Sequence, residues 1–177
     1  MPSPENESPD DPLRAHDITI RDSAEPVSLD QLERIERSLN LRLPAEYRSF
    51  LLRANGGVPE PRHFHYTVID EDEGTRRRQK AKITRFYPAR PTEAPGAPGN
   101  SFLTGYQNAI PFGFPDWLLP IAGVDDALEG SLLCIAVKGK KQGRIYYWPE
   151  QEIGEDTLHH VADSFKSFLA LLENRKA

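Results

Sequence analysis

Residues 39–57 read LNLRLPAEYRSFLLRANGG. Pro44 suits the first position of a helix, because the amide hydrogen that proline lacks would have no partner there. Apolar residues then recur at helical spacing and predict one buried face, formed by Tyr47, Phe50, Leu51 and Ala54. Asn55-Gly56-Gly57 ends the helix, since asparagine and glycine both tolerate the left-handed conformation of a helix C-cap.

A second helix is predicted just before this segment. Ser28 and Gln31 have the spacing of a capping box, and Val27 and Leu32 have that of a hydrophobic staple. Apolar residues continue at helical spacing as far as Leu39. We therefore expect a helix over about 28–40. Only a few residues join it to the next helix, so the two should pack as a bent pair.

The last third of the chain predicts strands and a closing helix. Residues 117–122 and 132–137 read as strands, and a turn at 138–143 leads to a partner strand at 144–148. A final helix over about 163–174 has an apolar face made of Phe165, Phe168, Leu169 and Leu172. We expect a single α+β domain with an N-terminal helix pair, a central and mainly antiparallel sheet, and a C-terminal helix.

The middle of the chain is unusually charged and rich in proline. An acidic turn at 70–74 precedes a basic run at 76–82, and alternating residues flank both. This pattern predicts a long charged hairpin. Residues 88–100 contain several prolines and glycines, which predicts an irregular loop. We therefore expect residues 70–100 to be an insertion in the domain.

Composition restricts the classes of function. The net charge is −5 and the pI is about 5.6, which argues against nucleic-acid binding and favours a basic partner. No apolar stretch approaches the roughly 20 residues of a membrane-spanning helix. Residues 1–16 are acidic and proline-rich, so we expect a flexible tail before a domain at 17–177. The tail lacks a secretory signal, and the chain has one cysteine, so we expect a cytoplasmic protein.

The chain resembles the SUKH superfamily, the SMI/KNR-type domain. In that family a helix and a short apolar segment are followed by Leu-Pro, an aromatic residue, Phe-Leu and an Asn-Gly-Gly stop. The similar positions here are Leu43, Pro44, Tyr47, Phe50, Leu51, Asn55, Gly56 and Gly57. Residues 111–113 and 118–122 and the closing helix follow in the family's order, so the resemblance covers about 27–173.

The resemblance implies a small α+β fold used as a protein-binding scaffold. Bacterial members commonly neutralise toxin domains as immunity proteins, and fungal members act as regulatory scaffolds. The shared motif consists of a helix start, core aromatics and a glycine stop, so it supports the fold more than the function.

The residues that could carry chemistry do not form a recognisable catalytic or metal-binding set. Cys134 with His159 or His160 could act as a nucleophile and base, but the thiol lies in an apolar run and is expected in the core. His63 and His65 alternate on one face of a strand, without the spacing of a known metal site. We therefore expect no catalytic residues, no metal and no cofactor.

Clustered carboxylates are the candidates for binding a partner. They could imitate phosphates and occupy the basic active-site cleft of a toxin; simple solubility is the competing interpretation. Two aromatic residues of the strand at 144–148 could anchor the interface or instead cover the core. The candidate partner-binding residues are Asp70, Glu71, Asp72, Glu73, Asp125, Asp126, Glu129, Tyr146, Trp148, Glu150 and Glu152.

The leading hypothesis is a non-catalytic immunity protein that binds a cognate toxin domain with a basic surface and occludes its active site. The alternative is a regulatory scaffold of the same fold that has no toxin partner. Neither hypothesis involves a nucleic acid or a membrane.

Overall fold

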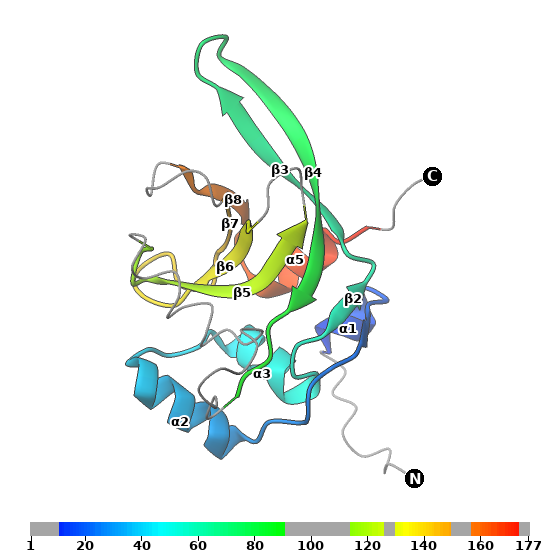
Figure 1. The fold of residues 1–177 in the computed structure, drawn as a ribbon, viewed down its shortest axis with the longest axis vertical. Helices are drawn as coiled ribbons and strands as arrows, with labels where there is room; N and C mark the ends of the chain where they lie inside the picture. Colours follow the sequence, from blue (N-terminus) through cyan, green and yellow to red (C-terminus); the bar gives the residue numbers. More distant parts are fainter. Residues whose placement is uncertain (1–10, 91–113, 126–129, 150–156, 174–177) are drawn as a thin grey trace.

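The computed structural model describes residues 11–90, 114–125, 130–149 and 157–173. Its elements form an α+β fold that agrees with the expected class (Figure 1). The helices are α1 (Pro12–Ala15), α2 (Leu29–Leu39), α3 (Ala45–Arg53) and α5 (Phe165–Ala170). The strands are β1 (Thr19–Arg21), β2 (Val58–Glu60), β3 (His63–Asp70), β4 (Thr75–Phe86), β5 (Leu118–Asp125), β6 (Leu132–Ala136), β7 (Ile145–Trp148) and β8 (His159–Ala162).

The predicted helix pair is confirmed, with its capping box in place. The Ser28 side chain accepts a hydrogen bond from the Gln31 N–H at 3.2 Å, and Gln31 Oε1 accepts from the Ser28 N–H at 2.9 Å. Asn40 ends α2 in the left-handed conformation. Pro44 occupies the N-cap of α3 rather than its first helical position, so the helix begins at Ala45.

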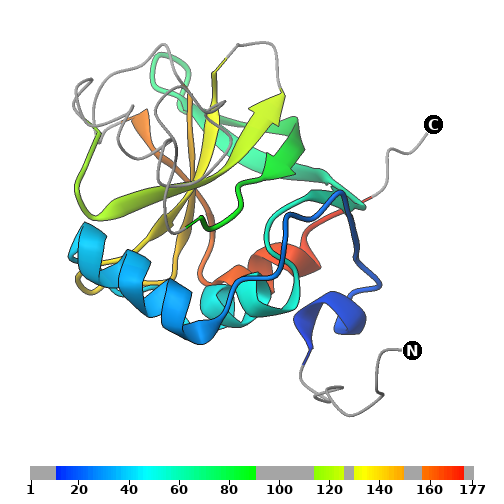
Figure 2. The same cartoon turned by 60° about the horizontal axis from the view of Figure 1, so that its bottom comes forward.

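Strands β3 to β8 form one antiparallel sheet in the order β3-β4-β5-β6-β7-β8, and β1 pairs with β2 in a small second sheet. The sheet curls strongly, so β3 also contacts β8 at the opposite edge. Helices α2, α3 and α5 lie together against one side of the curled sheet (Figure 2). Four aromatic rings meet in this layer, those of Tyr47, Phe50, Phe86 and Phe165.

Two boundaries and one strand differ from the expectation. Strand β5 continues to Asp125, because its later residues pair with β4. The closing helix is shorter than 163–174: Ser164 caps α5, and the helix ends at Ala170. Strand β8 was not predicted, because its sequence begins with two histidines and has little alternating apolar character.

The segment assigned to a tail and the predicted loop lie partly within the described residues. Residues 12–15 form α1, whose Leu13 is buried in the core, while residues 1–10 lie outside the description. Residues 91–100 of the predicted loop lie outside it as well. The longest described helix, α2, has 11 residues, well short of the roughly 20 that cross a bilayer.

Candidate partner-binding surface

The predicted charged hairpin is a two-stranded ribbon that projects from the sheet. Strand β4 has 12 residues, but only the part from Lys82 to Phe86 pairs with β5. Residues 75–81 pair with β3 alone, and the ribbon reaches well beyond the rest of the molecule (Figure 1). Residues 71–80 are all exposed. A free two-stranded ribbon contributes little stability by itself, so core packing does not explain its length.

The tip of the ribbon carries a compact group of carboxylates. Asp70 Oδ1 accepts hydrogen bonds from the N–H groups of Asp72 and Glu73 at 3.2 and 3.3 Å, which shapes the turn. Gly74 completes the turn with a positive φ of 62°. Arg77 contacts Asp70 and Glu73 at 3.5 and 3.3 Å. Among the described residues, Glu71 and Asp72 have no ion-pair partner, so their charges face solvent.

The stem of the ribbon carries a row of cations on one face. Directly paired residues share a face, and the register places Ile69 beside Arg76, Thr67 beside Arg78 and His65 beside Lys80. The opposite face turns toward the core, where Phe64 is fully buried and Tyr66 stacks on Tyr147 with ring centroids 4.2 Å apart. The basic row, Arg76, Arg78, Lys80 and Lys82, therefore lies on the outer face.

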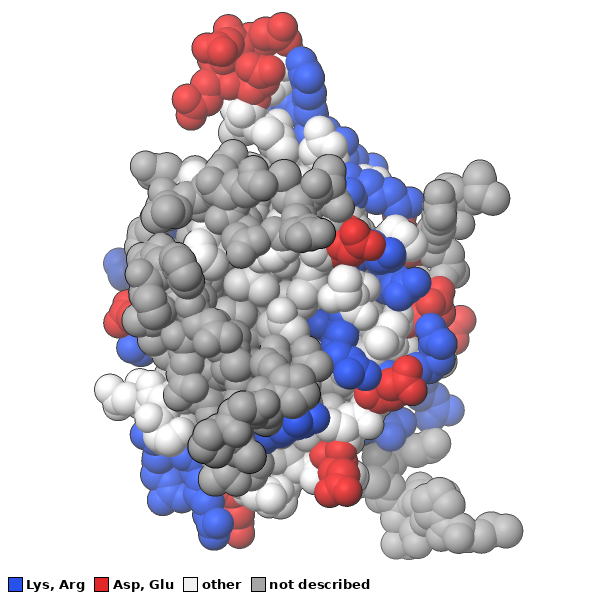
Figure 3. All heavy atoms as spheres, in the orientation of Figure 1, with Lys and Arg blue, Asp and Glu red and all other residues white. Residues whose placement is uncertain are grey.

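The acidic tip and the basic row follow one another along the ribbon (Figure 3), with Arg76 next to the tip. Lys80 lies opposite His65, which precedes Asp70 by five residues, a distance of about 17 Å at the rise of an antiparallel strand. That is about twice the screening length of roughly 8 Å at physiological ionic strength. Lys80 and Lys82, at the far end of the basic row, therefore present a positive field that the acidic tip does not cancel, whereas Arg76 lies within the field of the tip.

The remaining predicted carboxylates do not all lie on the ribbon. Asp125 ends β5 at the base of the ribbon, where its carboxylate pairs with Lys82 at 2.5 Å. Its charge is thus already matched within the molecule. The other four candidates, Asp126, Glu129, Glu150 and Glu152, lie outside the described residues.

Tyr146 and Trp148 lie in β7, and each is only 6% exposed. Trp148 packs edge-on against Phe114, with ring centroids 4.7 Å apart, and Tyr146 packs edge-on against Trp117, with ring centroids 5.5 Å apart. Both rings therefore pack within the fold and leave little area for a partner.

Three of the candidate chemical groups are engaged within the fold, Cys134 by packing and His65 and His160 by polar contacts. Cys134 is fully buried, and burial raises the pKa of its thiol, which keeps the sulfur in its unreactive protonated form. His65 Nδ1 lies 3.2 Å from Glu173, and His160 Nε2 lies 3.0 Å from Asp163. The described residues hold no group of three side chains suited to binding a metal ion.

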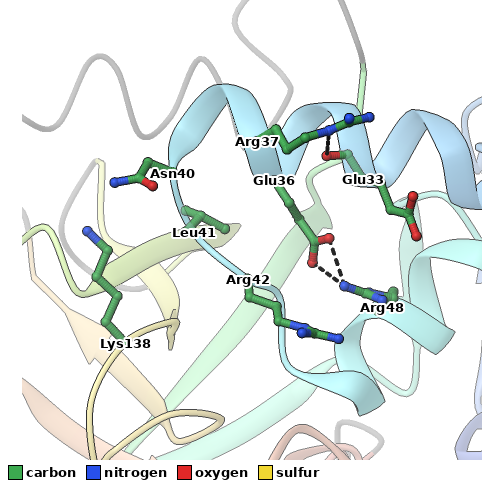
Figure 4. Close-up of a pocket in the computed structure, with 8 residues that line it drawn as sticks. All are labelled: Glu33, Glu36, Arg37, Asn40, Leu41, Arg42, Arg48 and Lys138. Atoms are coloured by element: carbon green, nitrogen blue, oxygen red, sulfur yellow. Dashed lines mark hydrogen bonds and ion pairs between the residues drawn. The ribbon is translucent and has the colours of Figure 1, made fainter.

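A shallow hollow lies where α2 meets α3 and the turn after β6 (Figure 4). The Glu36 carboxylate projects into it and binds Arg48 at 2.6 and 2.7 Å. The same carboxylate accepts a hydrogen bond from the Leu43 N–H at 2.7 Å. Glu36 and Arg48 are therefore already paired with each other, and the contact in this hollow holds the two helices together.

The motif around Pro44 is structural as well. Leu43, Tyr47, Phe50 and Leu51 are all buried in the core. Gly57 has φ of 114°, and its backbone exchanges two hydrogen bonds with Phe86. Asn55, in contrast, does not adopt the left-handed conformation expected of it, and Ala54 is the C-cap. Asn55 instead acts through its side chain, whose Nδ2 donates hydrogen bonds to the carbonyls of Glu25 and Ala89.

Comparison with known families agrees with this architecture. The model of the SMI1 / KNR4 family (SUKH-1) matches residues 26–171, which is most of the chain. No curated protein matches the sequence.

Proposed function

Because the chain belongs to the SMI1 / KNR4 family (SUKH-1), we propose that it is a non-catalytic immunity protein. It binds a cognate toxin domain in the cytoplasm and blocks the active site of that toxin. Members of this family are generally immunity or regulatory proteins that bind other proteins, which supports a protein partner here. The full burial of Cys134 keeps its thiol away from any substrate and agrees with a binding role.

The observation that carries the proposal is the acidic tip on a projecting ribbon. A ribbon two strands wide can enter a cleft that is too narrow for the body of the domain. Glu71 and Asp72 face solvent there, so they can pair with cations that line the cleft. A cleft that binds phosphate groups is rich in lysine and arginine, and the carboxylates would occupy the phosphate positions.

The partner is best identified by affinity purification of the tagged protein from its native cells, with mass spectrometry of what co-purifies. The proposal expects one stoichiometric partner that carries a toxin domain, and rescue of growth when both proteins are coexpressed. Recovery of a housekeeping complex would overturn the immunity role and point to a regulatory scaffold.

The tip is then tested with a charge-reversed variant, Glu71→Lys with Asp72→Lys. Its matched control is Glu25→Lys with Glu33→Lys, which makes the same change in net charge at exposed positions away from the ribbon. The tip variant should bind the partner at least about tenfold more weakly, with a smaller dependence on salt. Equal affinities for the two variants would show that the tip does not make the contact.

A further inference from the structure

Beyond the bridge at His63 and the pairing with β5, neither outer backbone edge of the ribbon pairs with a strand among the described residues. The directions of the two edges follow from the ladder. The His63 N–H and carbonyl bond to Glu173 on the side away from β4, whereas Arg62 accepts from Ile83 on the β4 side. Backbone groups alternate in direction along an antiparallel strand. The backbone groups of Thr67 and Ile69 therefore point away from β4. On β4, those of Arg76 and Arg78 point away from β3 by the same rule.

The two edges differ in how they are protected. Proteins commonly guard a free edge with charged side chains, proline or a bulge. The β4 edge carries Arg76, Arg78 and Lys80 at its outward positions. The β3 edge carries the uncharged run Tyr66-Thr67-Val68-Ile69, which favours strand structure and contains no bulge in its pairing with β4. Among the described residues no strand pairs with this edge.

Exposure and charge indicate what this edge accepts. Ile69 is 59% exposed, the highest value among the large hydrophobic residues described. A strand added beside β3 would lie about 9.6 Å from β4, two strand spacings away. On the outer face, the short side chain of Thr67 lies between the added strand and Arg78 of β4. Arginine is long enough to reach across it. Neither Arg76 nor Arg78 has an ion-pair partner among the described residues.

We propose that the β3 edge at Thr67 and Ile69 docks an extended segment of a partner protein, which adds a strand to the sheet. Carboxylates on the outer face of that segment pair with Arg76 and Arg78. The inference rests on the proposed function only in taking the partner to be a protein. It adds that the bound segment is acidic and extended.

The test uses the full-length chain and a defined probe, so it does not depend on finding a toxin. The probe is an acetylated and amidated octapeptide that alternates glutamate and valine, and a lysine–valine peptide is its control. Amide chemical shifts are followed by NMR during titration. The expected result is saturable shifts at Thr67, Ile69, Arg76 and Arg78 with the acidic peptide only. No shifts at about 1 mM peptide, or shifts centred elsewhere, would overturn the proposal.

Two variants separate backbone pairing from charge. Thr67→Pro removes an outward N–H without breaking the ladder to β4, because that N–H points away from β4. Arg76→Gln with Arg78→Gln removes the cations and keeps the strand. Each should weaken peptide binding about tenfold, and only the second should abolish its dependence on salt. If Thr67→Pro disturbs the fold, Thr67→Lys replaces it, because a lysine on an edge strand opposes the addition of another strand.

Self-association is the competing outcome. Sedimentation that depends on protein concentration, and that Thr67→Lys abolishes, would assign the edge to a second copy of this chain and overturn the assignment to a partner. A monomer that binds the acidic peptide supports the proposal even if the co-purified partner is no toxin. A toxin partner with no peptide binding would leave the immunity role standing and remove the docking edge.

Discussion

The side chain of Asn55 exchanges two hydrogen bonds with the backbone of Ala89: its Oδ1 accepts from the Ala89 N–H at 2.7 Å, and its Nδ2 donates to the Ala89 carbonyl at 3.0 Å. The same Nδ2 donates to the Glu25 carbonyl at 2.8 Å. One buried amide thus ties the end of α3 to the segment before α2 and to the segment after β4.

We expect Asn55→Ala to lower the free energy of unfolding by about 2–4 kcal/mol, because it leaves the buried N–H and carbonyl of Ala89 without partners and removes the bond to the Glu25 carbonyl. Urea denaturation measures the loss. The control is Asn40→Gly at the left-handed C-cap of α2, where glycine is equally suited and the change should be small. A similar loss in both variants would contradict the role of the Asn55 amide.

Glu36→Gln should lower the free energy of unfolding by about 1–2 kcal/mol, because a neutral amide binds Arg48 and the Leu43 N–H more weakly than a carboxylate does. A double-mutant cycle with Arg48→Met should give a favourable coupling energy of about 1 kcal/mol or more. Glu33→Gln, at an exposed position on the same helix, should change stability by less than about 0.5 kcal/mol. Zero coupling would mean that the pair does not join the helices.

Gly57→Ala should destabilise the fold by more than about 2 kcal/mol. A Cβ there would lie 2.6 Å from the Arg21 carbonyl oxygen, and φ is 114°. Gly74→Ala is the matched control, because its φ is also positive but its added Cβ would meet no atom within 4 Å. The control should cost only about 1 kcal/mol, for the left-handed conformation itself. Thermal unfolding of both variants distinguishes steric collision from backbone conformation.

Stability should fall at alkaline pH through Cys134. Burial raises the pKa of its thiol in the folded state, while the pKa of the thiol in the unfolded chain is about 8.5. The contribution is therefore complete below about pH 8.5 and declines above it by up to about 1.4 kcal/mol per pH unit. Comparing the wild type with Cys134→Ala between pH 7.5 and 10 isolates this effect. A difference between the two that is independent of pH would contradict it.

The outer end of the ribbon should be dispensable for folding. Replacing residues 69–76 by Asn-Gly joins Val68 to Arg77, which are directly opposite each other, through a two-residue hairpin turn. The shortened chain should keep its free energy of unfolding within about 1 kcal/mol, because the removed residues bury little area. It should also lose binding of the partner. A large loss of stability would show that the ribbon supports the fold and would weaken its assignment as a binding element.

Local sequence determined the helix pair, its capping box, the turn at Gly74 and the burial of Cys134. Those features depend on residues a few positions apart, through periodicity, capping and turn conformation. The family motif was readable for the same reason, since Pro44 and Gly57 act on the backbone next to them. The acidic tip was also visible, because it is continuous in sequence.

Only the tertiary structure decided which of these residues face solvent. The hairpin projects because the pairing of β5 with β4 ends at Lys82. The sequence of the hairpin does not predict where that pairing ends. The backbone groups of Thr67 and Ile69 point to the same side as those of His63, to an edge that pairs with no other strand in the part of the chain that the structure describes. Asn55 bonds Ala89, 34 residues away, and Tyr146 is covered by Trp117. Each of these contacts joins distant parts of the chain, so its free energy and direction arise only once the sheet has formed.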